Sequence, residues 1–184
     1  DSLAAMDNEA WWAQEMKRMD EGNKLIFMNK MAEAEAVFKA GVEANTDTGV
    51  VRPFDLRGAF ALNFALASVI RGVASMANDQ LDECAERLWQ ADQLASEDRD
   101  WVGQAAVRGI CTLEGGLIML MQHSWAKGVW NVLRSWTYIK RIRDEALDYE
   151  GQEKEVVRSV GLVTVGVFNI LLSLLPPSPP LRPL

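Results

Sequence analysis

The chain has 184 residues, 49% of them hydrophobic and 24% charged, which suits one sizeable core or a short solenoid of repeats. With 26 Asp and Glu against 19 Lys and Arg, its formal net charge is −7, which argues against a nucleic-acid partner. Cys84 and Cys111 lie far apart with no Cys-x-x-Cys spacing and no histidine beside them, so we expect two buried, reduced thiols.

The ends of the chain bear on its compartment and its completeness. The sequence has no Asn-x-Ser/Thr sequon and no signal peptide at its start, which favours the cytoplasm. It begins with Asp1 rather than Met and ends in a proline-rich segment, so we expect a fragment of a longer protein. We predict one helical repeat domain over residues 1–175 and a proline-rich disordered tail over residues 176–184.

Helical periodicity recurs from about residue 9 to residue 175, and no stretch alternates like a strand, so we predict an all-α fold of about seven helices. The first helix should cover residues 9–28. Asn29 is a candidate N-cap for the second helix, because its side chain can accept a backbone hydrogen bond there. The apolar positions are Trp12, Met16, Met19 and Ile26 in the first helix and Met31, Ala34, Phe38 and Val42 in the second.

The first helix pair also carries a spacing similar to that of a tetratricopeptide repeat. Gly22 is followed by Ala34, by Phe38 four residues later and then by Gly41. The small residues would let the two helices cross closely, and Phe38 would fill the space toward the next repeat. This spacing predicts a helix hairpin.

Two later helix pairs repeat one pattern at a shift of 44 residues, which predicts stacked antiparallel hairpins. The first helices match at Gly58, Leu62, Ala65, Val69, Gly72 and Met76 against Val102, Ala106, Gly109, Leu113, Gly116 and Leu120. The second helices match at Leu81, Ala85, Leu88, Asp92 and Ala95 against Trp125, Val129, Val132, Trp136 and Ile139. Tight turns are expected at Asn78 or Asp79 and at His123 or Ser124.

The longest uncharged apolar segment covers residues 159–175, and Pro176 and Pro177 end it. We predict a buried repeat helix in which Asn169 hydrogen-bonds across a helix interface. A membrane span needs about 20 apolar residues, and this segment has 17 uncharged residues that include polar side chains. Membrane association through residues 159–175 is the alternative, since an uncovered apolar helix can also adhere to a membrane or to a second copy.

Residues 166–176, Gly-Val-Phe-Asn-Ile-Leu-Leu-Ser-Leu-Leu-Pro, resemble a segment of the tetratricopeptide repeat protein 39 and inclusion body clearance protein family. The early Asn-Lys-Met-Ala-Glu-Ala of residues 29–34 is similar to the opening repeat of that family. The resemblance implies an intracellular, non-catalytic adaptor with roles around inclusion-body clearance and lipid handling and, in some animal members, cilia. That family continues into further repeats, whereas this chain turns proline-rich at Pro176, and Arg158 and Ser159 replace small glycines.

Candidate reactive groups are few. His123 is the only histidine and has no second histidine or suitably spaced thiol as a metal partner. The acidic residues Asp144, Glu145, Asp148 and Glu150 lack the spacing of a calcium loop. The one basic stretch, with Arg134, Lys140, Arg141 and Arg143 around Trp136 and Tyr138, is typical of a solvated face, with anionic-lipid or nucleic-acid binding as the alternative. We therefore expect no enzyme, no cofactor and no metal.

Taken together, the patterns favour a superhelix of three hairpins and a seventh helix that presents a groove to a protein partner. The partner-binding residues we predict are polar positions on the small-residue helices, namely Asn63, Arg71, Gln104 and Arg108. The expected location is cytoplasmic, with contact to organelle or lipid surfaces as the implied variant.

Overall fold

The structure is a computed structural model that describes residues 2–46, 52, 54–97, 101–151 and 153–174. Within those ranges the chain forms seven α-helices and no strand, which confirms the predicted all-α fold. The helices are α1 (Ser2–Phe27), α2 (Met31–Ala44), α3 (Arg57–Ser75), α4 (Asn78–Ala95), α5 (Val102–Met121), α6 (Trp125–Glu145) and α7 (Lys154–Leu174). The predicted tail over residues 176–184 lies outside the described residues.

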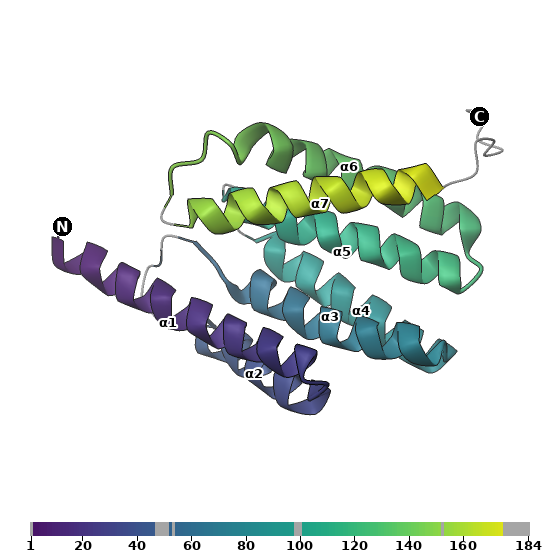
Figure 1. The fold of residues 1–184 in the computed structure, drawn as a ribbon, viewed down its shortest axis with the longest axis horizontal. Helices are drawn as coiled ribbons and strands as arrows, with labels where there is room; N and C mark the ends of the chain where they lie inside the picture. Colours follow the sequence, from purple (N-terminus) through teal and green to yellow (C-terminus); the bar gives the residue numbers. More distant parts are fainter. Residues whose placement is uncertain (1, 47–51, 53, 98–100, 152, 175–184) are drawn as a thin grey trace.

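Consecutive helices pair into three antiparallel hairpins, α1 with α2, α3 with α4 and α5 with α6, while α7 packs along α5 and α6 (Figure 1). The odd-numbered helices also touch one another in order, α1 with α3, α3 with α5 and α5 with α7. Among the described residues the backbones of the even-numbered helices do not approach one another in this way. The odd-numbered helices lie closer to one another than the even-numbered helices do. They therefore form the inner side of the stack, and the even-numbered helices form its outer side.

Each hairpin reverses through one residue in the left-handed region. Asn29, Met76 and His123 have φ values of 59°, 55° and 61°. The backbone N–H of Lys30 donates to Leu25 at 2.9 Å, which satisfies a carbonyl at the end of α1. The prediction of Asn29 as an N-cap is therefore wrong, since its short polar side chain serves the left-handed turn that ends α1.

The turn predicted at His123 or Ser124 is confirmed, whereas the turn predicted at Asn78 or Asp79 comes earlier in the chain. His123 is confirmed in the turn between α5 and α6, where the N–H of Ser124 donates to Met119 at 2.8 Å. Asn78 and Asp79 lie one step further on, in the first turn of α4, because Met76 takes the left-handed position.

The small residues mark the places where helices cross. A Cβ at Gly22 would collide with the ring of Phe38, which is fully buried, so the predicted crossing of α1 and α2 is confirmed. In the third hairpin, a Cβ at Gly116 would lie 2.9 Å from the carbonyl oxygen of Gly128 and 2.9 Å from the backbone nitrogen of Val132. The backbones of α5 and α6 therefore meet directly at this pair of glycines.

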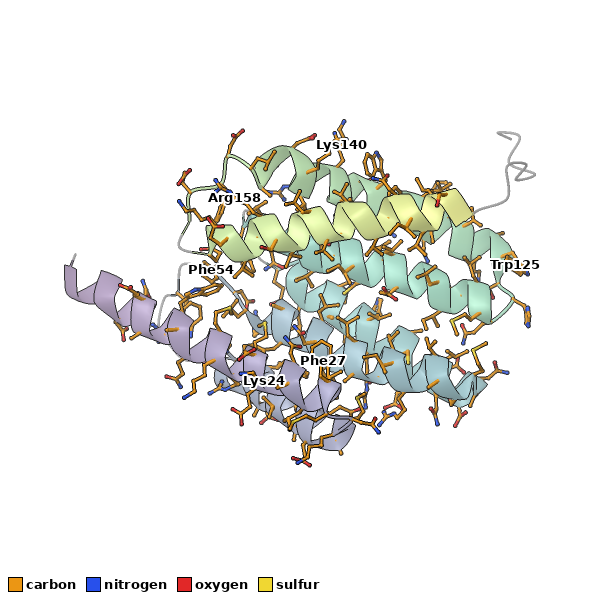
Figure 2. The ribbon with its side chains drawn as sticks, viewed as in Figure 1. Lys24, Phe27, Phe54, Trp125, Lys140 and Arg158 are labelled. Atoms are coloured by element: carbon orange, nitrogen blue, oxygen red, sulfur yellow. The ribbon has the colours of Figure 1, made fainter. Side chains whose placement is uncertain are left out.

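Trp125 and Asn169 are exposed, although both were predicted to make contacts within the stack. Trp125, predicted on the core face, is 62% exposed and points away from the stack at the start of α6 (Figure 2). The helix begins at this residue, so no preceding turn lies over its side chain. On α7, Phe168 is buried against the stacked ring of Trp136 at 5.0 Å, whereas Asn169 is exposed. The predicted hydrogen bond of Asn169 across a helix interface is therefore wrong.

Candidate functional site

A groove on the inner side of the stack passes between α1 and α7, across α3 and α5, and contains a cavity of about 260 Å³. We call it the inner groove and define it by Met16 on α1, Leu62 on α3, Ala106 on α5 and Val156 and Val160 on α7. All five side chains are apolar. Within the described residues α1 and α7 do not pack on each other, so the groove between them stays uncovered.

One buried carboxylate lies at the α7 end of the inner groove. Glu153 is 2% exposed and precedes the first residue of α7. Its Oε1 accepts hydrogen bonds from the Trp101 Nε1–H at 2.7 Å and from the Tyr149 hydroxyl. Two donors compensate for the lost hydration of the carboxylate, so Glu153 ties the start of α5 to the start of α7.

Aromatic side chains close the same end of the groove. The ring of Phe54 stacks on Trp101 at 4.8 Å and meets Trp12 edge-on at 5.2 Å. Phe54 is itself buried and comes from the connection between the first and second hairpins. Rings packed in this way form a firm wall, while Met16 and Met19 on α1 are unbranched and adapt to the shape of what they touch.

The structure separates the four predicted partner-binding residues. Asn63 lines the inner groove, and its Nδ2 donates to the Ala59 carbonyl at 2.9 Å. Arg71 lies on the outer side, where its guanidinium meets the carboxylate of Glu35 at 3.1 Å. Our expectation that the four residues share one groove is therefore wrong, although partner binding by each residue stays a prediction.

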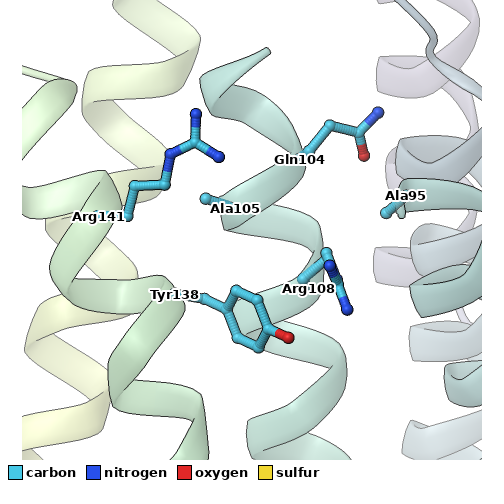
Figure 3. A pocket seen from close by; sticks show the side chains of 6 residues that line it. All are labelled: Ala95, Gln104, Ala105, Arg108, Tyr138 and Arg141. Carbon is cyan, nitrogen blue, oxygen red and sulfur yellow. The ribbon is translucent and has the colours of Figure 1, made fainter. Parts of the chain in front are cut away.

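The other two predicted residues, Gln104 and Arg108, line a second cavity of about 120 Å³ between α4, α5 and α6 (Figure 3). Arg108 donates from Nε to Asp92 at 2.9 Å, and its guanidinium lies 4.8 Å from the centre of the Tyr138 ring. Gln104 is 2% exposed, so its side chain is buried rather than freely displayed as expected. Within the described chain its amide nitrogen and oxygen have no hydrogen-bond partner.

The reactive groups of the sequence occupy unreactive surroundings. Cys84 and Cys111 are free and buried, as predicted, and burial raises the pKa of both thiols, which disfavours the nucleophilic thiolate. Burial also raises the pKa of Glu114 on α5. Among the described residues no group of three His, Cys, Asp or Glu side chains is placed to hold a metal ion.

Comparison with protein-family models, curated proteins and solved structures found no match to this chain. The resemblance to the tetratricopeptide repeat protein 39 family therefore stays a prediction that rests on residues 29–34 and 166–176.

The described helices leave the outward, apolar face of α7 uncovered. Leu162, Val163 and Ile170 are 68%, 65% and 62% exposed. Among the described residues two helical segments, Arg57–Ser75 and Lys154–Ser173, are long and apolar enough by length and composition to cross a membrane. Half of the first segment is buried in the fold, but only 22% of the second is.

The residues that close one end of the inner groove, Glu153 and Trp101, were not among the predicted site residues. Glu153 stands among other charged residues at a helix start, and Trp101 stands alone before α5, so neither has a local pattern. A detectable signal does occur on α6, where Lys127, Asn131, Arg134, Tyr138 and Arg141 follow the spacing of a single helix face.

Proposed function

We propose that this protein is a non-enzymatic helical-repeat adaptor whose inner groove binds the apolar face of a helical segment from a partner protein. The observation that carries the proposal is the apolar cavity of about 260 Å³, to which α1, α3, α5 and α7 all contribute side chains. Concave stacks of helices offer long, shallow surfaces of this kind, and an amphipathic helix fits them with side chains three and four residues apart.

The groove lining favours an apolar occupant. Met16, Met19 and Trp12 on one wall are the residue types that carry much of the binding energy and adaptability of protein interfaces. On the opposite wall Val156 is 44% exposed, so an incoming side chain can reach it. The carboxylate of Glu153 is already held by two donors. Apart from the tryptophan indoles, Asn63 is the one other polar side chain among the described residues that line the cavity, which leaves little to hold a charged ligand.

A peptide-display selection on the full chain, with a library of amphipathic helices, tests this proposal. Val156→Arg places a charge in the inner groove and should abolish binding of the selected peptides. Val163→Arg is the matched control, because Val163 lies on the outward face of the same helix and is 65% exposed. Selected peptides that bind both variants equally well, or a selection that enriches no amphipathic helix, would refute the inner groove as the binding surface.

The family resemblance supports a more specific role. It suggests that the adaptor acts in inclusion-body or lipid-related handling in the cytoplasm. Aggregate clearance in cells that express the Val156→Arg variant tests this role, which predicts slower clearance than with Val163→Arg.

Membrane association is the second candidate function, and the exposed apolar face of α7 favours it. A helix with Leu162, Val163 and Ile170 outward can lie in a bilayer interface while its other face stays on the protein. Alkaline carbonate extraction separates the two candidates, because an adaptor is released into the supernatant and an anchored protein stays in the pellet. Leu162→Gln together with Ile170→Gln should release an anchored chain and leave a soluble adaptor unchanged.

A further inference from the structure

The outer side of the stack carries a second groove, between α4 and α6 and across the back of α5. We call it the outer groove. Its α6 wall consists of the face with Lys127, Asn131, Arg134, Tyr138 and Arg141, and Trp89 stands on its α4 wall. Cavities of about 390, 150 and 120 Å³ lie along its described residues; the first two share Met119 and Asn131, and the last is the one shown in Figure 3.

The preceding hairpin has the equivalent groove, but its own side chains fill it. There, between α2 and α4, Arg71 reaches Glu35 at 3.1 Å and Glu83 at 3.7 Å. Arg87 pairs with the same two carboxylates and covers the ring of Phe64 at 4.1 Å. An ion-pair network thus closes this first groove.

At the positions 44 residues later in the chain, other residues replace the side chains that close the first groove. The outer groove therefore stays open. Gly115 stands where Arg71 stands in the first groove, and a Cβ built on it meets nothing within 4 Å. Lys127 takes the place of the carboxylate Glu83, and Asn131 takes the place of Arg87. These replacements remove the ion pairs and leave a cation in their place.

The charge of the outer groove is opposite to that of the whole chain. Four of its lining side chains are cationic, namely Arg108, Lys127, Arg134 and Arg141, and one, Asp92, is anionic. Asp92 is paired with Arg108, and Arg141 with the exposed carboxylate of Glu145. In a protein of net charge −7, this strip of positive charge is a local exception that attracts an anionic group.

A buried amide lies at one end of the same groove. Gln104 projects from α5 toward Ala95 on α4, beside the cavity that Tyr138 and Arg141 also line (Figure 3). Within the described residues both of its polar side-chain atoms are unpartnered. An unpaired buried amide destabilises the fold, so a ligand that offers both a donor and an acceptor, or a carboxylate, is favoured there.

We propose that the outer groove binds an acidic, extended segment of a partner protein, with one of its side-chain carboxyl or carboxamide groups in the cavity beside Gln104. Lys127, Arg134 and Arg141 are seven residues apart, or about 10.5 Å along a helix. In the extended polyproline II conformation three residues complete one turn and advance about 9.3 Å, so acidic residues at every third position lie on one face and match the three cations. The exposed tryptophans Trp89 and Trp130 add apolar contact at the edges.

A protein segment suits this site better than a longer polyanion. The cations are confined to the groove, while the rest of the chain is acidic and repels a nucleic acid or an anionic membrane that extends beyond it. This inference rests on the proposed adaptor role but uses a separate surface, so either can fail alone.

Fluorescence anisotropy with the full chain and a labelled nine-residue peptide tests the proposal. The probe has Asp at positions 2, 5 and 8 in a Gly-Ser background, and two control peptides have the three Asp residues adjacent or replaced by Lys. We expect the spaced peptide to bind more tightly than the adjacent one and the Lys peptide not to bind. No change in anisotropy at millimolar protein, or equal affinity for both Asp peptides, would overturn the proposal.

Variants locate the binding and separate it from the inner groove. Arg134→Glu should weaken peptide binding about tenfold. Lys39→Glu is the control, because Lys39 is an exposed residue of α2 and the substitution changes the charge by the same amount, so it should not weaken binding. Gly115→Leu fills the floor of the outer groove without changing its charge, and it should weaken peptide binding as much as Arg134→Glu does. Circular dichroism checks that this variant is folded. Val156→Arg should leave the peptide bound.

The same variants decide between chemical classes. An oligothymidine or a phosphatidylserine vesicle that binds as tightly as the peptide, and is lost with Arg134→Glu, would show a general anion site and overturn the assignment. Equal effects of Arg134→Glu and Lys39→Glu would do so as well, because binding would then follow net charge and not the groove.

Discussion

Adding one methyl group at Gly116 should destabilise the protein, although the same change helps most helices. In a helix interior, alanine is more favourable than glycine by about 0.5–1 kcal/mol. The new Cβ would, however, lie 2.9 Å from two backbone atoms of α6, which cannot rotate away as a side chain could. Overpacking of this kind costs about 1–3 kcal/mol, so we expect Gly116→Ala to be less stable by about 1–2 kcal/mol.

The neighbouring Gly115 supplies the control, because a Cβ there meets nothing within 4 Å. Gly115→Ala should therefore stabilise the protein by about 0.5–1 kcal/mol. In thermal unfolding followed by circular dichroism, each kcal/mol corresponds to a shift in Tm of about 2–4 °C at this chain length. If Gly116→Ala melted at or above Gly115→Ala, the direct contact of α5 with α6 at these glycines would be wrong.

Three further predictions follow from buried groups. Burial raises the pKa of Glu114 in the folded state, so the stability of the fold decreases as the pH rises through that pKa. Glu114→Gln should therefore raise Tm at pH 7 but not at pH 3, where Glu114 is protonated. Melting curves recorded at both pH values measure this. Phe38→Ala should cost about 3–5 kcal/mol in urea unfolding, because Phe38 is fully buried against Gly22; a cost below 1 kcal/mol would contradict that packing. Cys84 and Cys111 should react with iodoacetamide in the folded chain far more slowly than in urea, as mass spectrometry measures, and equal rates would contradict their burial.

The stacking of the hairpins could be predicted because it depends on local sterics. A small residue such as Ala65 or Gly109 permits close approach whatever the partner is, and both are buried where the repeat pattern placed them. The same reasoning was wrong about the start of α1, which begins at Ser2 and not at residue 9. It was also wrong about Asn29, because an asparagine suits both an N-cap and a left-handed turn.

The grooves could not be predicted because they depend on how each helix is rotated about its own axis. One residue along a helix turns the side chain by about 100°, so a small rotation decides whether Gln104 faces solvent or the neighbouring α4. Glu153 and Trp101 meet across 52 residues of sequence, and only the packing of α7 on α5 brings them together. Patterns within single helices carry no information about such meetings.

The order of contacts along the stack has a consequence for how the protein is made. Each described helix contacts only helices that are no more than two elements away in the chain. No hairpin therefore needs a distant part of the sequence in order to bury its apolar face. Low sequence separation between contacts favours fast folding. The first hairpin can therefore fold while the ribosome is still synthesising the third hairpin. This shortens the time during which apolar surface of the nascent chain is exposed and able to aggregate.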